Sequence, residues 1–331
     1  MSNDNKIVSI QYLRGLAALG VVLCHYGSSL SSYPLLSSFF NFGQSGVYVF
    51  FLISGVIIVY SLSKANYKPG QFFKFLLKRS IRIDPSYIVV ILLTIALFKI
   101  LAHIPSFKGR EINFVPGQFI AHLFYVVPFT KYHFYDHVFW TLSVEFQFYL
   151  LIGILYFISN NHLYKVTFLI LFSATCLIPF TNAYYLVFNY VPIFATGISL
   201  VEFYLNRKWV NRILPLLLLS LVAYKFGFPV FILLIFTIAI ILLFKLTIKP
   251  LKVLGDISYS LYLTHPLVLI VVLGIAKRLQ FATLQNQLLS LFFETTIAIL
   301  FAYLFYRTVE KPTTILSKHI FYSKKSSPVK G

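Results

Sequence analysis

The sequence predicts an all-α fold: a polytopic transmembrane helical bundle of about ten spanning helices with one short re-entrant or interfacial helix. Hydrophobic residues make up 59% of the 331 residues and charged residues only 11%, whereas a soluble domain carries about 25% charged residues. Apolar runs of about 20 residues recur from end to end, and each is long enough to cross a bilayer as a helix. Most basic residues stand in short segments beside these runs, as in membrane proteins.

The apolar runs give the elements in order along the chain. Residues 213–226 and 227–244 are separated only by a turn near Gly227, which predicts a tight helical hairpin. The stretch 117–129 is too short to cross a bilayer and is expected to be re-entrant or interfacial. The spanning helices are expected at 7–29, 45–63, 86–104, 137–159, 166–181, 185–204, 213–226, 227–244, 257–276 and 286–306.

The distribution of Lys and Arg predicts the orientation. With ten spans and the N-terminus inside, the inner segments hold 20 of the 28 basic residues, the outer segments hold seven, and Arg14 lies within a span. This asymmetry places both termini in the cytoplasm. Residues 1–312 are expected to form one membrane domain and residues 313–331 a basic cytoplasmic tail. The first run is long and has no obvious cleavage site, so it is expected to be a retained helix and not a signal peptide.

Charge and cysteine content exclude two other classes of function. The net charge of +19 does not indicate nucleic-acid binding, because most basic residues flank apolar runs. Cys24 and Cys176 both lie in apolar runs, and two cysteines give neither a disulfide framework nor a metal-binding spacing.

Ionisable residues inside the first span predict a buried functional site. A charge at membrane depth is costly unless it faces a bundle interior or a water-filled cavity. Arg14 and His25 are eleven residues apart, which puts them within about 20° of one helix face and about 16 Å apart along the axis. Gln11 lies on the same face. The alternative is an Arg that snorkels inward and a His that bonds a neighbouring helix, but the shared face favours a polar cavity.

The helix at 137–159 carries a second polar stripe. Thr141, Glu145 and Tyr149 are spaced i, i+4, i+8 and share one face. Glu145 lies about two turns below the outer surface and His25 about one turn, so the two are expected to meet. A carboxylate that orients an imidazole and stabilises its cation makes a general-base pair. A structural ion pair between helices is the alternative.

Two further segments carry candidate residues. Lys78, Arg79 and Arg82 cluster just before Asp84 and Pro85, and Arg forks suit phosphate oxygens. From these residues alone, ordinary positive-inside charge or anionic-lipid binding is the favoured explanation. In the helix at 257–276 one face carries Ser258, Tyr262 and His265, and His265 is as suited to positioning a substrate as to bonding a neighbouring helix. Glu294 also lies at membrane depth, in the last helix, where a structural bond is the alternative to function.

These segments, in this order, resemble acyltransferase family 3, a family of integral membrane acyltransferases. The resemblance covers about residues 7–312. Its pieces are LRGLAALGVVLCH with Arg14 and His25, VYVFFLISGVII with Ser54 and Gly55, RSIRIDPSY with Arg79 and Arg82, FWTLSVEFQFY with Trp140 and Glu145, SYSLYLTHP with His265, and FYRTVEKP with Glu310 and Pro312.

Two positions depart from the family pattern. Gln11 stands where many members carry an acidic residue, and the I-Q-x-L-R form is associated with exopolysaccharide-type members. Asp84 stands where the family usually has an apolar or aromatic residue. An acid beside Arg79 and Arg82 is expected to weaken phosphate binding there.

The resemblance implies a function and a site. It implies an O-acyltransferase, most simply an O-acetyltransferase, that moves an acyl group from cytoplasmic acetyl-CoA or another acyl-CoA to a hydroxyl of a cell-surface polysaccharide or its lipid-linked precursor in the bacterial inner membrane. Membrane lipids are expected partners, and neither a metal nor nucleic acid is expected. The expected roles are catalytic for His25 and Glu145, donor-binding for Arg14, Arg79 and Arg82, and substrate-binding for Trp140, Tyr149, Tyr262 and His265.

Two other functions stay open at the level of the sequence. A transporter or flippase of an anionic or lipid-linked substrate also explains many helices with buried charges, but not an Arg anchor joined to a His–Glu site. Acylation of a small molecule such as an antibiotic is a second alternative.

Overall fold

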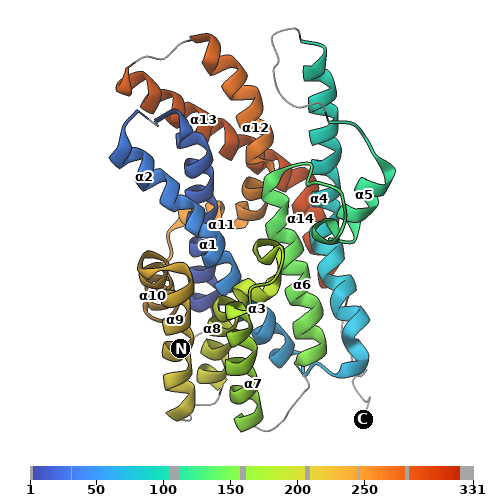
Figure 1. Cartoon of the computed structure of the whole chain (residues 1–331), viewed down its shortest axis with the longest axis vertical. Coiled ribbons are helices and arrows are strands. Elements are labelled where there is room, and N and C mark those ends of the chain that lie inside the picture. The colour runs from blue at the N-terminus through green and yellow to red at the C-terminus, as the bar shows by residue number, and fades with distance from the viewer. Residues whose placement is uncertain are drawn as a thin grey trace, which may run out of the picture.

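In the computed structural model, the described residues form helices and no strand, so the predicted all-α bundle is confirmed (Figure 1). The structure describes residues 3–30, 32–104, 112–156, 162–205, 209–244, 246–279 and 283–320. The helices of the first half are α1 (Asn3–Tyr26), α2 (Pro34–Phe42), α3 (Gly46–Lys64), α4 (Phe72–Ala102), α5 (Pro116–Leu123) and α6 (Trp140–Leu155). Those of the second half are α7 (His162–Ala174), α8 (Val187–Leu205), α9 (Trp209–Phe226), α10 (Phe228–Leu243), α11 (Lys249–Asp256), α12 (Ser258–Leu279), α13 (Leu284–Phe305) and α14 (Lys311–Lys318).

Fewer helices of the described chain are long and apolar enough to cross a membrane than the ten that the sequence predicts. Six stretches of the described chain are long and apolar enough to cross a membrane, and a seventh results if the bent pair α11–α12 counts as one span. The other three predicted spans are helical but are not among these stretches: α7 has 13 residues, α9 has 18 and α10 has 16. All ten predicted helices are present in the described chain, but ten complete crossings are not confirmed.

Helix α4 differs most from its predicted bounds. It begins at Phe72 and not near residue 86, because the basic segment before Pro85 is itself helical and the proline lies inside the helix. Proline is tolerated inside membrane helices when neighbouring side chains satisfy the backbone groups around it. Pro85 leaves the carbonyl of Ile81 without its helical N–H partner; nearby, the hydroxyl of Tyr259 on α12 donates to the carbonyl of Ile83 and ties this part of α4 to α12. The two halves therefore form one rod that runs nearly the full height of the molecule (Figure 1).

The predicted re-entrant or interfacial stretch at 117–129 is a helix followed by a short 3₁₀ turn. Helix α5 ends at Leu123 and the 3₁₀ turn Val127–Phe129 follows it. Between them Tyr125 has a left-handed backbone with φ 58°. His122 is fully buried there: its Nδ1 faces the carbonyl of Gln118, and its Nε2 accepts from the backbone N–H of Tyr135.

Close helix approaches build the bundle around α1 and α3. Gly55 on α3 faces Gly197 on α8, and a Cβ at either position would collide with the backbone of the other helix. Gly15 on α1 packs in the same way against Gly255 on α11. Small residues at such crossings let membrane helices pack with their backbones in contact.

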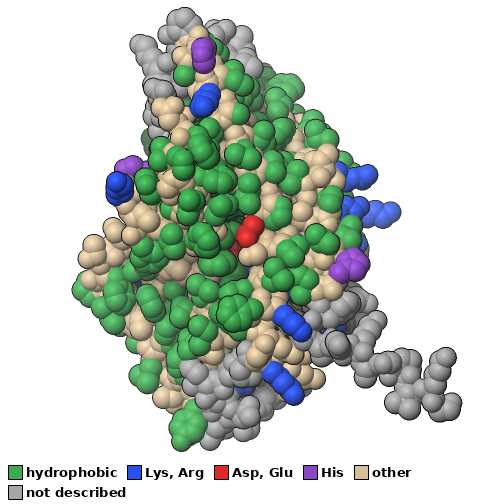
Figure 2. Space-filling view, turned by 90° about the vertical axis from the view of Figure 1, so that its right-hand side faces the viewer, with side chains coloured by type: hydrophobic (Ala, Val, Ile, Leu, Met, Phe, Trp, Pro, Cys, Tyr) green, Lys and Arg blue, Asp and Glu red, His purple; other side chains and the backbone are tan. Residues whose placement is uncertain are grey.

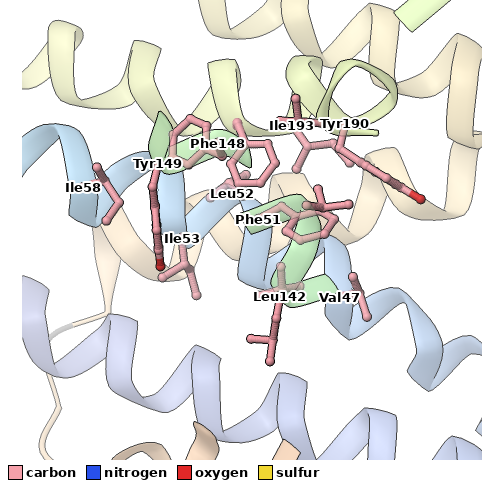
Figure 3. Close-up of a cluster of buried hydrophobic side chains, with 14 of the residues drawn as sticks. Val47, Phe51, Leu52, Ile53, Ile58, Leu142, Phe148, Tyr149, Tyr190 and Ile193 are labelled. Atoms are coloured by element: carbon pink, nitrogen blue, oxygen red, sulfur yellow. The ribbon is translucent and has the colours of Figure 1, made fainter. Parts of the chain in front are cut away.

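A hydrophobic cluster between α3, α6 and α8 forms one wall of the bundle interior (Figure 3). Phe51, Phe148 and Phe194 stack there, with ring centroids 4.8 Å apart for Phe51–Phe194 and 4.2 Å for Phe148–Phe194. Tyr149 stands at the edge of the cluster with its hydroxyl turned away from it. The cluster therefore holds α6 rigidly while presenting that hydroxyl to the space beyond.

The outer surface beside α4 and α5 is apolar. Hydrophobic side chains cover most of this face, and Lys and Arg stand toward its margins (Figure 2). Exposed side chains on α4 include Phe73, Leu77, Leu92 and Ile100. A large apolar surface of this kind is typical of helices that face lipid.

The C-terminal part packs onto the bundle. After α13 the chain continues through a π-helical turn, Tyr306–Glu310, into α14. Lys78 on α4 donates to the carbonyl of Ile320, and Ser317 on α14 is buried. The predicted tail at 313–331 thus begins inside a packed helix, and residues 321–331 lie outside the described part of the chain.

Candidate active site

One cavity collects most of the predicted polar residues. It has a volume of about 100 Å³ and lies between α1, α3, α4, α6, α12 and the π-helical turn before α14. The described residues of its wall that carry polar side chains are Arg14, Ser54, Arg79, Arg82, Thr141, Glu145, Tyr149, Tyr259, Tyr262 and Glu310. Segments more than 290 residues apart in the sequence therefore meet around a single polar space.

The three Arg residues predicted to bind a donor all line this cavity. Arg79 and Arg82 come from the basic part of α4, and Arg14 comes from α1. Arg79 is only 8% exposed, and its guanidinium carbon lies 5.7 Å from the ring centroids of both Phe75 and Tyr149. Arg14 lies close enough to Arg82 and Glu310 for their charges to interact. Three guanidinium groups in one cavity make it a suitable place for an anion.

Glu145 is held by hydroxyl groups of its own wall. Its Oε1 accepts from the Ser54 hydroxyl at 2.7 Å and from the Tyr149 hydroxyl at 2.6 Å. These bonds join α3 to α6 and fix the carboxylate at the cavity surface, near Arg14. The predicted stripe of Thr141, Glu145 and Tyr149 does face one space, because all three line the cavity.

Glu310 lines the cavity, although the sequence analysis named it only in a motif of the family resemblance and gave it no site role. Its Oε2 accepts from both the backbone N–H and the hydroxyl of Ser260, and its side chain is 5% exposed. The last span was predicted to end at residue 306, which placed Glu310 in the cytoplasm. The helix instead continues through the π-helical turn, and this brings the carboxylate back to the cavity. The available signals were the motif FYRTVEKP, which contains this acid, and the scarcity of acids in a chain that has only nine Asp and Glu.

A pair of hydroxyls lines the cavity where α6 meets α12. Tyr262 and Thr141 lie 2.9 Å apart by their oxygens, and the Tyr262 hydroxyl also donates to the carbonyl of Val138. Phe50 packs edge-on against the Tyr262 ring at 5.7 Å. Tyr262 thus stands between the Arg-lined space and what lies beyond it.

His25 lies beyond Tyr262, next to His265. The two imidazole ring centroids are 5.1 Å apart, and the rings of Tyr262 and His265 are 5.9 Å apart. His265 is fully buried, and its Nδ1 is 2.7 Å from the carbonyl oxygen of Tyr262. His25 is half-buried and does not line the cavity. We call His25 and His265 the histidine pair.

The expected contact between His25 and Glu145 is not present in the described part of the chain. Glu145 bonds Ser54 and Tyr149, whereas His25 has His265 as its ring neighbour. The reason is the place of His25 in the last turn of α1, beside α12, while Glu145 faces the Arg residues further along α6. The catalytic roles of both residues stay predictions.

The other predicted residues fall outside the cavity. Trp140 is buried among aromatic rings, 4.4 Å from Tyr184 and 5.6 Å from Tyr190 by ring centroids. Ser258 is fully buried. Glu294 is 2% exposed and accepts from the hydroxyl of Ser290. Trp140 thus has a packing role, whereas Oγ of Ser258 and Oε2 of Glu294 are buried without a hydrogen-bond partner among the described residues.

Asp84 is directed toward Tyr125. Its Oδ1 accepts from the Tyr125 hydroxyl at 2.7 Å, and Tyr125 stacks on the rings of Tyr87 and Phe146. The acid that departs from the family pattern therefore fastens the segment after α5 onto α4 and α6. Gln11, the other departure, donates from its amide to Asp256 on α11.

A family model described as an acyltransferase domain matches residues 7–307, nearly the whole chain. The chain belongs to acyltransferase family 3. No curated protein and no solved structure matches it. With its apolar helices, this family member is a multi-pass membrane protein of the acyltransferase class. Among the described residues no group of three or more His, Cys, Asp or Glu side chains could hold a metal ion.

Proposed function

We propose that this acyltransferase moves an acyl group, acetyl in the simplest case, from cytoplasmic acyl-CoA to a hydroxyl of a cell-surface polysaccharide or its lipid-linked precursor. The observation that carries the proposal is the single cavity in which Arg14, Arg79 and Arg82 meet, with the histidine pair beyond its outer end. An anion site next to a group able to take a proton is what transfer from a charged thioester donor requires.

The donor would enter with its phosphates toward the Arg residues. Arg79 and Arg82 lie near the start of α4, which the charge distribution places on the cytoplasmic side. Against the three Arg charges the cavity wall carries two carboxylates, Glu145 and Glu310, so the wall is left with a net positive charge that suits an anion. The pantetheine arm would then point the thioester past Arg14 toward Tyr262.

The reaction needs one proton acceptor near the thioester. His25 would take the proton of the acceptor hydroxyl as that oxygen attacks the thioester carbonyl. The new carbon–oxygen bond forms, the carbon–sulfur bond breaks, and the proton passes from His25 to the leaving thiolate. Direct transfer is favoured over an acyl-enzyme, because Cys24 adjoins His25 on α1 and neighbouring helical positions diverge by about 100°.

Glu145 would act on the substrates and not on His25. Its bonds to Ser54 and Tyr149 keep a fixed carboxylate at the cavity wall. There it would balance Arg14 and position the acceptor hydroxyl or the thioester. Tyr149 and Tyr262, which line the cavity, are the other residues that we place around the substrates.

The proposed setting is the bacterial inner membrane with both termini in the cytoplasm. The excess of basic residues in the inner segments supports this orientation. Acyl-CoA is then available at the inner end of the cavity, and the glycan acceptor approaches from the outer end. Membrane lipids surround the apolar face, and no nucleic acid takes part.

Turnover by the purified protein tests this proposal. The protein in lipid nanodiscs is mixed with acetyl-CoA and a surface-glycan fragment, and both CoA release and glycan mass are followed. Glycan-dependent CoA release with a gain of one acetyl mass supports the proposal. Transport of an anionic solute in proteoliposomes without CoA release would instead favour a transporter. Release that depends only on a small molecule such as an antibiotic would change the acceptor class.

A further inference from the structure

His265 has one ring nitrogen that is bonded and one that is not. Its Nδ1 lies 2.7 Å from the carbonyl oxygen of Tyr262, and its own carbonyl accepts from the Tyr26 hydroxyl at 2.8 Å. The side chain is fully buried, and its Nε2 has no hydrogen-bond partner among the described residues. Buried polar atoms are bonded in the great majority of cases, so this nitrogen calls for a partner.

The bond to Tyr262 decides the chemical character of that nitrogen. A carbonyl oxygen can only accept, so Nδ1 of His265 carries the hydrogen and donates it. In the neutral ring the other nitrogen, Nε2, then has a lone pair and no hydrogen. Nε2 of His265 is therefore a buried hydrogen-bond acceptor without a donor among the described residues.

His25 is the group placed to supply the donor. Its ring centroid lies 5.1 Å from that of His265, with 39° between the ring planes. The elements packed around the pair carry few other ionisable groups: Tyr26 and Cys24 on α1, Tyr262 on α12, His137 before α6, and Glu294 on α13 near Tyr26. Tyr26 and Tyr262 already donate to carbonyl oxygens of His265 and Val138.

We propose that His265 is the positioning residue for His25. A turn of the His25 imidazole lets one of its nitrogens donate to Nε2 of His265, which fixes the tautomer and leaves the other nitrogen as the base. This inference rests on the proposed function, in which His25 takes the acceptor proton. When the hydroxyl oxygen attacks the thioester, the proton moves to the free nitrogen of His25, the bond to His265 holds the imidazolium, and the proton then leaves with the thiolate.

His122 shows what a purely structural buried histidine looks like in the same chain. It is also fully buried, but both of its nitrogens are in use, at the carbonyl of Gln118 and the N–H of Tyr135. His265 differs by a single open acceptor, and that acceptor lies beside the one histidine that the proposed chemistry needs. Other buried polar atoms, such as the hydroxyls of Ser86 and Tyr87, also lack a partner among the described residues; His265 is distinguished from them by its position beside the His25 ring.

Two substitutions of His265 test the inference through kinetics. His265→Phe keeps a buried ring without nitrogen, and His265→Gln keeps a side-chain oxygen that can accept. We expect His265→Phe to lower kcat by about tenfold to about hundredfold with KM for acetyl-CoA within about twofold, since general-base assistance contributes a hundredfold or more. His265→Gln should keep several times more kcat than His265→Phe. Equal losses in both variants, or a loss that appears in KM alone, would overturn it.

A second measurement needs no turnover and so separates this inference from the proposed function. Diethyl pyrocarbonate modifies unprotonated imidazole, and peptide mass spectrometry follows the rate at His25. A hydrogen bond from one ring nitrogen raises the basicity of the other, so His265→Phe should slow modification of His25 at least about threefold, and His265→Gln should restore much of it.

Matched controls keep both measurements interpretable. Glu294→Gln, on α13 near Tyr26, should leave the modification rate of His25 unchanged. If His265→Phe does not fold, the comparison of His265→Gln with His265→Asn, whose shorter side chain withdraws the acceptor, replaces it. An unchanged modification rate of His25 in every His265 variant would refute the pairing even if the wild-type enzyme transfers acetyl groups.

Discussion

The Arg-lined cavity and the histidine pair lie a few side chains apart and differ in the kind of polar group that they contain. In the cavity, charges of both signs face one space and the carboxylates are held by hydroxyl groups. The histidine pair consists, among the described residues, of two imidazoles and one ring nitrogen that accepts no hydrogen bond. Tyr262 belongs to both, since it lines the cavity and its carbonyl faces His265. The difference suggests that one region holds an anion while the other moves a proton.

The largest expected effect is at the histidine pair. His25→Ala should lower acyl transfer by at least about a hundredfold, because a general base contributes about 10²–10⁴ to the rate. Binding of acetyl-CoA should be unchanged, since His25 does not line the cavity. Turnover and CoA binding are measured on the same nanodisc preparation. A well-folded His25→Ala variant that keeps more than about a tenth of wild-type turnover would show that His25 is not the general base.

The second effect belongs to the cavity. Arg79→Ala and Arg82→Ala should each weaken acetyl-CoA binding by about tenfold to about a hundredfold, because a charge-assisted hydrogen bond contributes about 1.5–3 kcal/mol. Lys at either position should restore only part of the affinity, since it lacks the planar fork. Calorimetric titration with CoA measures the change. Unchanged CoA affinity in the double variant would show that Arg79 and Arg82 only contribute positive charge that sets the membrane orientation.

A smaller effect is expected for the carboxylate at the cavity wall. Glu145→Gln keeps an oxygen for Ser54 and Tyr149 but removes the charge near Arg14. We expect turnover to fall about tenfold with no loss of CoA affinity, because removing a negative charge leaves the anion site intact. Glu294→Gln is the matched comparison and should change turnover by less than about twofold. The opposite ranking of the two variants would show that the wrong acid was assigned to the site.

The sequence was sufficient to predict the helical bundle and that Arg14, Arg79, Arg82 and Glu145 are site candidates, all of which line one cavity, but not which residues they contact. The helical spacing of Arg14, Glu145 and Tyr262 predicts which way each side chain faces, because one helix fixes that locally. Which helix packs opposite is a tertiary property, and so the pairing of His25 was expected with Glu145 and not with His265. Glu310 was missed for a related reason: helix continuation through the π-helical turn depends on packing against α4 and α12, which no local pattern records.

A fourth prediction concerns the stability of the segment after α5. Burial lowers the pKa of His122 to about 4, below the usual value near 6.5. Neutral His122 therefore stabilises the fold fully above about pH 6.5, and this contribution, at most about 3 kcal/mol, is lost as the pH falls toward 4. Hydrogen exchange of residues 116–139 at pH 7 and pH 5 measures it. His122→Phe should remove the pH dependence of stability. If exchange of these residues stays equally pH-dependent in the variant, the pH dependence arises from another group.

The smallest expected effect tests the departure at Asp84. Asp84→Asn keeps an oxygen for the Tyr125 hydroxyl and should change CoA affinity by less than about twofold, whereas a true weakening of the anion site by Asp84 would make Asn bind more tightly. Tyr125→Phe should lower stability by about 1 kcal/mol, the usual net value of one hydrogen bond. Titration with CoA and thermal unfolding give the two numbers. Tighter CoA binding by Asp84→Asn would show that the Asp84 charge weakens the anion site.

Helix α4 has a consequence for how this protein could be altered. Within ten residues it carries the contact of Lys78 with Ile320, the cavity residues Arg79 and Arg82, and the bond of Asp84 to Tyr125. One inserted or deleted residue in this stretch turns everything beyond it by about 100° and shifts it by about 1.5 Å along the axis. A substitution in α4 can therefore change one of these contacts by itself, whereas an insertion or deletion displaces all the contacts that follow it.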